Sequence, residues 1–250
     1  MISFIVPAYN EERLLGATLA AVRAAAGATG EPYELIVADD ASADRTAEVA
    51  RAAGARVICV ACRQIAATRN AGAGAALGDR LFFVDADTLV DAVVVGAALQ
   101  ALRAGAVGGG AAVRFDGRVP RWAALLLPVL VWVFRTTGIA TGCFLFCTRA
   151  AFETAGGFDE TLYGAEEIAL SQALKRQGRL VVLRQTVTTS GRKLRTYAAG
   201  ELLGILARLA LRGTGSLRSR RGLEFWYGER REDTGDSKGS VSRSTAAELH

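Results

Sequence analysis

Histidine is almost absent from this chain of 250 residues. The one histidine, His250, is the last residue, a position where side chains are rarely held in place. This excludes a Ser-His-Asp triad, a Cys-His nucleophile, a histidine general base and a zinc site built on histidine. Acid–base chemistry therefore falls to carboxylates, lysine or tyrosine, and a bound metal ion should be a hard cation held by oxygen atoms.

Long hydrophobic runs are lacking as well. Hydrophobic residues make up 51% of the sequence. The longest strongly apolar stretch, Trp122–Phe134, is nevertheless well short of the roughly 20 residues that span a bilayer. Residues 1–7 begin directly as a strand without a basic leader, so no secretory signal is visible. These features predict a cytoplasmic protein.

Cysteine is scarce, and two of the four cysteines form the Cys59-Val-Ala-Cys62 spacing found in zinc and redox sites. Cys143 and Cys147 lie further along the chain and do not repeat that spacing. A strand–CxxC–helix order of the thioredoxin type is not evident either. The favoured interpretation is therefore buried, reduced thiols in a cytosolic protein.

The sequence does contain a regular alternation of strand and helix patterns. Over the first ninety residues, four apolar strand runs alternate with helical patterns. The strands are expected at 3–7, 34–38, 56–60 and 80–84, and the helices at 11–26, 46–53 and 66–77. This alternation predicts an α/β fold with a mostly parallel central sheet and helices on both faces. Later elements are expected as helices at 92–103, within 164–178 and at 197–212, and as strands at 111–115, 142–148 and 180–183, with glycine-rich residues 105–110 as a connection.

Acidic residues follow the predicted strands at the points where they end. Asp85-Ala86-Asp87 comes directly after the strand at 80–84, and ligands of parallel sheets bind at the carboxyl ends of the strands. Two carboxylates so close together repel each other unless a cation lies near them. One interpretation is a hard divalent ion that bridges to a diphosphate. The alternative is a pair of turn or helix-capping aspartates before Thr88.

Two further acidic pairs also allow two interpretations. One carboxylate of Asp39-Asp40 could accept hydrogen bonds from a nucleobase or ribose, and the other, with Ser42, could cap the helix that begins near Asp44. Glu166-Glu167 opens a predicted helix, where acids favour the helix dipole. Because no usable histidine is present, the same pair is the natural candidate for a general base.

Together these residues resemble family 2 glycosyltransferases of the GT-A fold. The resemblance covers about residues 2–185 and rests on five groups in the right order: Ser3–Glu12, Val37–Asp44, Ala67–Gly72, Phe83–Asp87, and Gly156–Glu160 with Glu166-Glu167. It implies an inverting enzyme that uses Mg²⁺ or Mn²⁺ to move a sugar from a nucleotide-diphosphate donor to an acceptor hydroxyl, on a glycan or a lipid-linked molecule.

The resemblance also assigns roles by position. It places Asp39 at the nucleobase of the donor, Asp85 near the ribose and the metal ion, and Asp87 as the more direct metal ligand. The catalytic general base falls on Glu167, and its neighbour Glu166 is the alternative for that role. Other expected contacts to the donor are Pro7, Ala8, Tyr9 and Glu11 in the nucleotide pocket, Arg69 on the nucleotide side or in a structural role, and Arg192 or Lys193 at the pyrophosphate.

It further implies a single GT-A-like domain over residues 1–227, with a nucleotide-binding half at about 1–90 and an acceptor-side half at 91–227. The Gly156-Gly157-Phe158-Asp159 segment would pack beside the acceptor. The polar residues 228–250, rich in Gly and Ser, predict a disordered tail.

Three features depart from the family pattern. The base position holds Glu rather than the more usual Asp, and Ala41 stands where many relatives have Gly. The Gln-x-x-Arg-Trp motif is absent, which speaks against a processive membrane synthase.

Positive charge is concentrated late in the chain. Residues 175–221 contain twelve Lys or Arg and one acid, Glu201, although the formal net charge is only +5. This is a solvated basic face or a surface for an anionic partner. Interleaved aromatics are lacking, which argues against nucleic acid and favours a pyrophosphate or an anionic membrane. With the apolar stretch 122–134 and the helix at 197–212, it suggests peripheral contact with the inner face of the cell membrane; a core or homodimer interface is the alternative.

Three other functions are the alternatives to a glycosyltransferase. A catalytically silent module that binds nucleotide sugar or membrane would conserve the fold without turnover. A sugar nucleotidyltransferase needs a Gly-rich, Arg-bearing loop after the first strand, where this chain has Pro7–Glu11. A dinucleotide oxidoreductase needs a GxGxxG motif at the first helix, which is missing.

Overall fold

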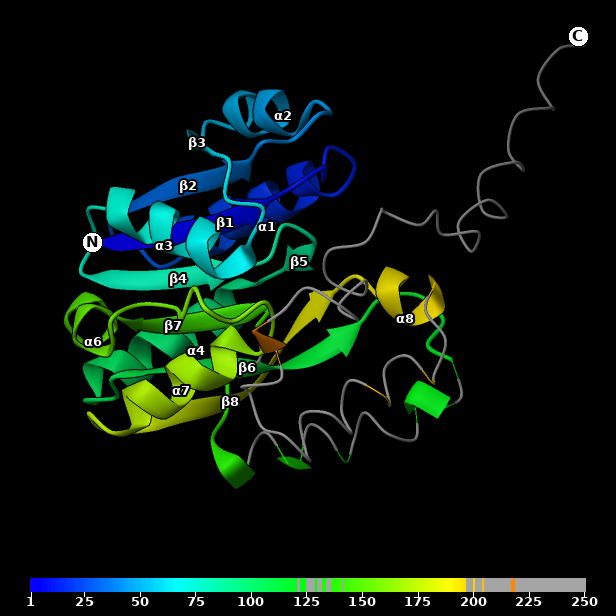
Figure 1. The fold of residues 1–250 in the computed structure, drawn as a ribbon. Helices are drawn as coiled ribbons and strands as arrows, with labels where there is room; N and C mark the ends of the chain where they lie inside the picture. The colour runs from blue at the N-terminus through cyan, green and yellow to red at the C-terminus, as the bar shows by residue number, and fades with distance from the viewer. Residues whose placement is uncertain are drawn as a thin grey trace, which may run out of the picture.

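The computed structural model describes residues 1–120, 122–124, 129, 132–133, 136–140, 142–196, 200, 204 and 217–218. Over these residues one eight-stranded sheet runs through the molecule in the order β3-β2-β1-β4-β7-β6-β8-β5 (Figure 1). The strands are β1 (Ile2–Ala8), β2 (Tyr33–Asp40), β3 (Arg56–Val60), β4 (Arg80–Val84), β5 (Thr88–Leu89), β6 (Gly108–Phe115), β7 (Phe144–Thr148) and β8 (Leu180–Thr189). The helices are α1 (Leu15–Gly27), α2 (Thr46–Ala52), α3 (Ile65–Ala75), α4 (Ala92–Arg103), α6 (Arg149–Ala155), α7 (Glu166–Lys175) and α8 (Arg192–Thr196).

The predicted α/β class is confirmed. Strands β3, β2, β1 and β4 are mutually parallel, and β6 pairs parallel with β8. Only β7 and β5 form antiparallel pairs among the described strands. The carboxyl ends of β1, β2, β3 and β4 therefore meet at one edge of the sheet, which is the edge expected to bind a ligand.

Helices cover both faces of the sheet, and each face has its own core. One core packs α1, α2 and α4 against side chains such as Phe4 and Phe82. The other packs α3, α6 and α7, seen in front of the sheet in Figure 1, against Ile5 and Phe83. Successive side chains of a strand point to opposite faces, so neighbours such as Phe82 and Phe83 serve the two cores in turn.

A glycine run forms part of a strand where the sequence predicted a connection. Residues Gly108, Gly109 and Gly110 open β6, which pairs with β7 on one side and β8 on the other. A Cβ atom on Gly109 would lie 2.0 Å from the carbonyl oxygen of Val181 and 2.7 Å from the ring of Phe146. The glycines thus permit close approach of the backbones of β6, β7 and β8. Strand propensity does not predict this strand because the reason for it lies in tertiary packing.

The exposure of the CxxC cysteines also differs from the expectation. Cys59 and Cys62 are exposed, Cys143 is half-buried and Cys147 is fully buried. Strand β3 lies at the edge of the sheet, so its final residues are not enclosed by a second neighbour. All four cysteines are free thiols, and only Cys147 fits the prediction of a buried one.

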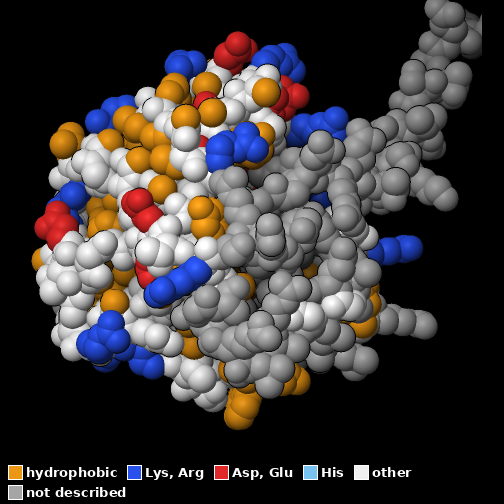
Figure 2. Space-filling view, viewed as in Figure 1, with side chains coloured by type: hydrophobic (Ala, Val, Ile, Leu, Met, Phe, Trp, Pro, Cys, Tyr) orange, Lys and Arg blue, Asp and Glu red, His pale blue; other side chains and the backbone are white. Residues whose placement is uncertain are grey.

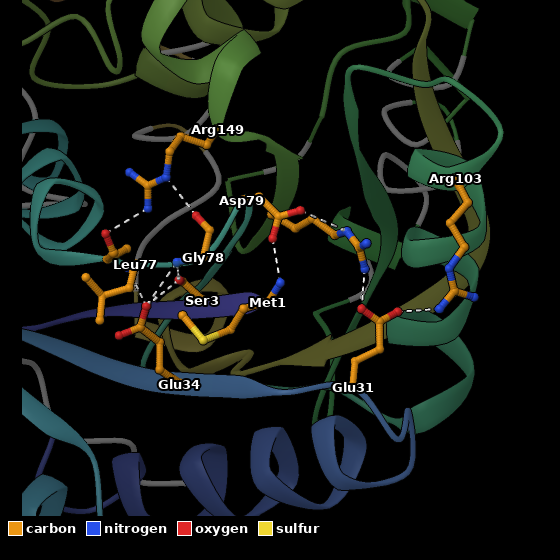
Figure 3. A network of polar contacts seen from close by, with 11 residues as sticks. Met1, Ser3, Glu31, Glu34, Leu77, Gly78, Asp79, Arg103 and Arg149 are labelled. Atoms are coloured by element: carbon orange, nitrogen blue, oxygen red, sulfur yellow. Dashed lines mark hydrogen bonds and ion pairs between the residues drawn. The ribbon is translucent and has the colours of Figure 1, made fainter.

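Polar side chains hold the opposite, amino-terminal edge of the sheet together (Figure 3). The Ser3 hydroxyl donates to Glu34 at 2.6 Å, and the same carboxylate accepts the backbone N–H of Gly78 at 3.3 Å. Glu31 is paired with both Arg80 and Arg103. This network lies at the amino ends of the strands and serves the fold rather than the ligand-binding edge.

Several expectations fall outside the described residues. They concern the tail at 228–250, nearly all of the helix at 197–212, and much of the apolar stretch at 122–134. In the part of the chain that the structure describes, no helix has both the length and the apolar composition needed to cross a bilayer.

Candidate active site

A cavity of about 180 Å³ opens at the carboxyl ends of the parallel strands. Its walls combine apolar, acidic and basic side chains from segments far apart in the sequence. They are Pro7, Ala8, Tyr9, Glu11, Asp40, Arg63, Gln64, Ile65, Thr68, Arg69, Asp85, Ala86, Asp87, Gly142, Glu166 and Glu167. Such convergence of polar groups in a concave site is typical of a ligand-binding site.

The loop after β1 is held against the loop after β2. The backbone N–H of Asn10 donates to the Ser42 hydroxyl at 2.9 Å, and the Asn10 side chain accepts the N–H of Ala43 at 2.8 Å. Ala41 adopts a left-handed conformation with φ of 55°. A glycine adopts this backbone conformation without strain. Ala41 keeps the conformation although many family members have glycine here, so the substitution does not abolish the turn after β2.

Asp40 organises the segment between β3 and α3. Its carboxylate accepts the backbone N–H groups of Cys62 at 2.7 Å, Arg63 at 2.8 Å and Gln64 at 3.1 Å, and the hydroxyl of Thr68 at 3.0 Å. The predicted capping role for Asp40 and Ser42 is therefore wrong, because both side chains join loops instead. It is Asp44 that accepts the backbone N–H of Thr46 at the start of α2.

Asp39 is buried, with 5% of its surface exposed, and lies in register with Ala8 of β1 and Cys59 of β3. One of its carboxylate oxygens, Oδ1, is buried without a hydrogen-bond partner among the described residues. An unsatisfied buried acceptor costs about 1–3 kcal/mol. Asp39 is not among the residues that line the cavity, although its strand partner Ala8 and its neighbour Asp40 are.

Arg69 joins the two halves of the site. Its guanidinium donates to Asp85 at 2.7 Å, to Glu166 at 2.6 Å and to the carbonyl of Gly142 at 2.9 Å. The Arg69 and Glu166 side chains are only 3% and 6% exposed, whereas Asp85 is 32% exposed. Burial alone would lower the pKa of Arg69, but Asp85, Glu166 and Glu167 raise it above its usual value. The cation beside Asp85 in this structure is therefore a guanidinium.

Glu167 lines the cavity beside Glu166, in the acidic first turn of α7. Burial raises the pKa of its carboxyl to about 8, and the neighbouring charge of Glu166 adds to this, while Arg69 opposes it. Once deprotonated, a carboxyl with a raised pKa is a stronger base than an ordinary carboxylate, so Glu167 can act as a general base increasingly as the pH rises toward this value. Glu166 is instead committed to Arg69, so the geometry favours Glu167 over Glu166 for that role.

Asp87 lies where the loop after β4 meets the end of β8. Its carboxylate accepts the Thr189 hydroxyl at 3.2 Å, and its carbonyl accepts the N–H of Ser190 at 3.2 Å. Asp85 and Asp87 offer hard oxygen donors, which fit Mg²⁺ or Mn²⁺. The described residues contain no cluster of three or more His, Cys, Asp or Glu side chains that could hold a metal. An ion here would need ligands from a bound diphosphate and water.

Arg192 approaches the site from α8 and pairs with buried Glu11 at 3.2 Å. It does not itself line the cavity, and the side chain of Lys193 lies outside the described residues. The backbone N–H of Glu11 also donates to the Thr46 hydroxyl at 2.8 Å, which fixes the position of Glu11. Arg192 is thus one side chain away from the cavity.

Most of the predicted site residues come together in one cavity. It brings together Pro7, Ala8, Tyr9, Glu11, Arg69, Asp85, Asp87, Glu166 and Glu167. Asp39 and Arg192 are not among the residues that line it. The other residues that line it, which the resemblance did not assign to the donor, the metal ion or the general base, are Asp40, Arg63, Gln64, Ile65, Thr68, Ala86 and Gly142.

Position alone could have found some of these missed residues. Arg63 and Gln64 lie three and four residues after the third strand, at the same edge as the acidic clusters, and the Arg63 guanidinium lies 4.0 Å from the centre of the Tyr9 ring. Gly142 precedes β7 and carries no comparable signal.

Comparisons with known proteins identify the family of the chain. A family model described as "Glycosyl transferase family 2" matches residues 3–155. An undecaprenyl-phosphate 4-deoxy-4-formamido-L-arabinose transferase from Pseudomonas paraeruginosa is 31% identical over 168 residues, covering 62% of this chain and 49% of that protein. Its counterpart from Edwardsiella ictaluri is 35% identical over 98 residues, covering 34% of this chain and 29% of that protein. This chain thus spans about half the length of the curated relatives it matches, or less.

Solved structures share the fold. A mannosyltransferase from Pyrobaculum calidifontis, in complex with GDP-Man and Mn²⁺, superposes with a TM-score of 0.62 at 19% identity, covering 89% of this chain and 64% of that one. Glucosyl-3-phosphoglycerate synthase from Mycobacterium tuberculosis, in complex with Mn²⁺, UDP and glucosyl-3-phosphoglycerate, gives 0.59 at 23% identity, covering 86% and 80%. At these identities the likeness establishes the GT-A glycosyltransferase fold.

Proposed function

The chain belongs to glycosyl transferase family 2, and from this membership we propose that it moves a sugar from a nucleotide-diphosphate donor to an acceptor hydroxyl, with inversion at the anomeric carbon. One observation carries the proposal. A single cavity is lined by the loop after β1, by Asp85 and Asp87, and by Glu167. These are a donor-binding segment, a diphosphate-side acidic pair and a candidate base.

The proposed reaction is a single in-line displacement. Glu167 accepts the proton of the acceptor hydroxyl while that oxygen attacks the anomeric carbon, and the bond to the nucleoside diphosphate breaks on the opposite face. The departing diphosphate gains negative charge, so stabilising groups are most effective there. Arg192 on α8 is paired with Glu11, which lines the cavity. Its guanidinium would stabilise the negative charge of the departing diphosphate from there.

The nucleoside end of the donor is assigned to the β1 side of the cavity. The Arg63 guanidinium stacks on the Tyr9 ring there. A nucleobase is also planar and can stack on such a pair. The unsatisfied Oδ1 of Asp39 is a hydrogen-bond acceptor of the kind that a base N–H would satisfy. This supports the expected role of Asp39 in recognition of the nucleobase.

The proposed divalent ion, Mg²⁺ or Mn²⁺, would be held by Asp87 with help from Asp85 and would supply positive charge beside the diphosphate. Asp85 is already bonded to the Arg69 guanidinium, and the family resemblance assigns the more direct metal contact to Asp87. The named complexes of the mannosyltransferase and the synthase with Mn²⁺ support a divalent ion in the proposed reaction.

Replacing Asp87 with asparagine is expected to abolish the response of activity to added Mn²⁺, because the amide lacks the charge that favours a divalent cation. Activity should be measured against Mn²⁺ concentration. Asp91→Asn provides a matched control, since Asp91 caps α4 outside the cavity and asparagine caps as well as aspartate. A normal Mn²⁺ response in Asp87→Asn would contradict the metal role.

The acceptor has a second candidate. The curated relatives are named for undecaprenyl phosphate, which offers a phosphate oxygen rather than a hydroxyl as nucleophile. A phosphate monoester is already ionised at neutral pH, with a second pKa of about 6, and needs no base. A hydroxyl acceptor does need one, so the raised pKa of Glu167 favours the hydroxyl.

The donor can be tested without knowledge of the acceptor. Nucleotide sugars should be screened for thermal stabilisation with and without Mn²⁺, because a ligand that binds the native state raises its apparent stability by mass action. The donors that stabilise should then be assayed for release of nucleoside diphosphate. Pyrophosphate release would indicate a nucleotidyltransferase, and no turnover of any donor, with or without acceptors, would indicate a silent module.

We also propose peripheral contact with an anionic membrane through the segment after β6. Val129, Trp132 and Val133 have helical backbone, share one helical face by their spacing, and are 58%, 65% and 36% exposed. Hydrophobic side chains gather at the lower edge of the molecule in Figure 2, where the green segments of Figure 1 lie. Lys175 donates to the carbonyl of Thr137 at 2.5 Å and brings exposed positive charge to the same region.

Replacing Trp132 with serine should weaken binding to vesicles that contain phosphatidylglycerol by between about 10- and 100-fold, since withholding a large apolar side chain from burial costs about 1.5–3 kcal/mol. Co-sedimentation at low salt measures this. Val93→Ser is the control, because Val93 is 66% exposed on α4, away from this segment. Equal binding of both variants would point to a core or homodimer role for the segment instead.

A further inference from the structure

Leu217 lies about forty residues after the end of α7 but packs against the loop that precedes that helix. Its side chain is only 1% exposed and forms a small cluster with Ala165, against which Tyr163 and Ile168 also pack. Its backbone carbonyl accepts the N–H of Tyr163 at 2.8 Å. An apolar contact and a backbone hydrogen bond therefore hold the same loop.

This loop leads directly into the acidic first turn of α7. Ala165 has a left-handed backbone with φ of 57°, and its carbonyl accepts the N–H groups of Ile168 and Ala169. On the cavity side, the amide of Gln64 donates to the carbonyl of Leu162 at 3.0 Å. A strained backbone of this kind persists only when its surroundings hold it. Gln64 and Leu217 hold it from different parts of the chain.

We propose that Leu217 is a positioning residue for sugar transfer, which fixes the backbone at residues 163–168 and thereby holds the Glu167 carboxyl at the cavity wall. The inference rests on the proposed function, because it presupposes that Glu167 acts there as the base. The family match ends at residue 155, so it covers neither Leu217 nor the helix that Leu217 supports.

Replacing Leu217 with alanine is expected to lower kcat by between about 10- and 100-fold, since small displacements of a reacting group have effects of this size. The KM for the donor should stay within about twofold, because the donor half of the cavity is unchanged. The pH midpoint of activity should move down as water reaches Glu167. The charged groups that face Glu167, namely Glu166 on α7, Arg69 on α3 and Asp85 after β4, remain in place.

Leu217→Met should restore most of kcat and the wild-type midpoint, because it refills the space with a similar volume. Leu99→Ala is the matched control, since Leu99 is 2% exposed in α4, remote from the loop. It should lose comparable stability with kcat and midpoint unchanged. If Leu217→Ala does not fold, Leu217→Val replaces it with the same readouts.

Wild-type kcat and midpoint in the Leu217 variant would overturn the inference, as would an equal loss of kcat in Leu99→Ala. Failure of the proposed function gives a different result. In that case the wild-type protein itself would show no transfer from any nucleotide sugar, whatever residue stands at position 217.

Discussion

Glu167→Gln is expected to lower turnover by about 10²–10⁴-fold, the usual contribution of a general base, while donor affinity stays nearly unchanged. Glutamine keeps the size of the side chain and cannot accept the proton of a hydroxyl. The donor contacts lie on other elements, so removing one carboxyl on α7 should affect kcat rather than donor binding. Single-turnover rates and donor titrations separate the two quantities.

Glu153→Gln is the matched control for this variant. Glu153 lies on α6, pairs with Arg149 at 3.6 Å, and has a side chain that is 63% exposed. The same substitution there should leave turnover unchanged. Unchanged turnover in Glu167→Gln would refute the assignment of the base and would favour an acceptor that is already ionised, such as a polyprenyl phosphate.

Arg69→Met should destabilise the protein by about 3–5 kcal/mol, the usual cost of removing one partner from a buried ion pair. The substitution leaves the Glu166 carboxylate, which is only 6% exposed, without its counter-charge. Asp85 is more exposed and can be hydrated, so it contributes less to the loss. Urea denaturation of wild type and variant measures the difference in the free energy of unfolding.

Adding Glu166→Gln to Arg69→Met should recover part of this stability, since it removes the uncompensated charge, and a double-mutant cycle isolates the coupling. Arg45→Met is the control at an exposed pair, where Arg45 is 77% exposed and bonded to Glu12. Such pairs contribute about 0.2–1 kcal/mol. A loss no larger than this for Arg69→Met would mean that the buried bridge across the site is not formed in solution.

Local patterns predicted much of the fold because most strands and helices carry their own periodicity. The strands at 56–60 and 80–84 and the helix at 92–103 agree residue for residue with β3, β4 and α4. The two residues of β5 are too short to show any period. The glycines of β6 give no strand signal, since their role depends on the backbones of β7 and β8. Such tertiary effects are not present in a local window.

The site residues likewise divide into those that the sequence could predict and those that it could not. Acidic residues at strand ends could be placed in one cavity, because the carboxyl ends of parallel strands share an edge. The partners of these residues could not be predicted. That Arg69 joins Asp85 to Glu166, and that Asp40 anchors the segment after β3, depend on loops whose conformation no periodicity describes.

The most direct test of the account is the pH dependence of kcat/KM for the wild-type protein and Glu167→Gln. Only the deprotonated carboxylate accepts the proton, so the wild-type value should rise with pH and level off near the Glu167 pKa of about 8. The glutamine variant should be slow and lack that rise. The same rise with the same midpoint in both proteins would contradict the claim that this cavity works through Glu167.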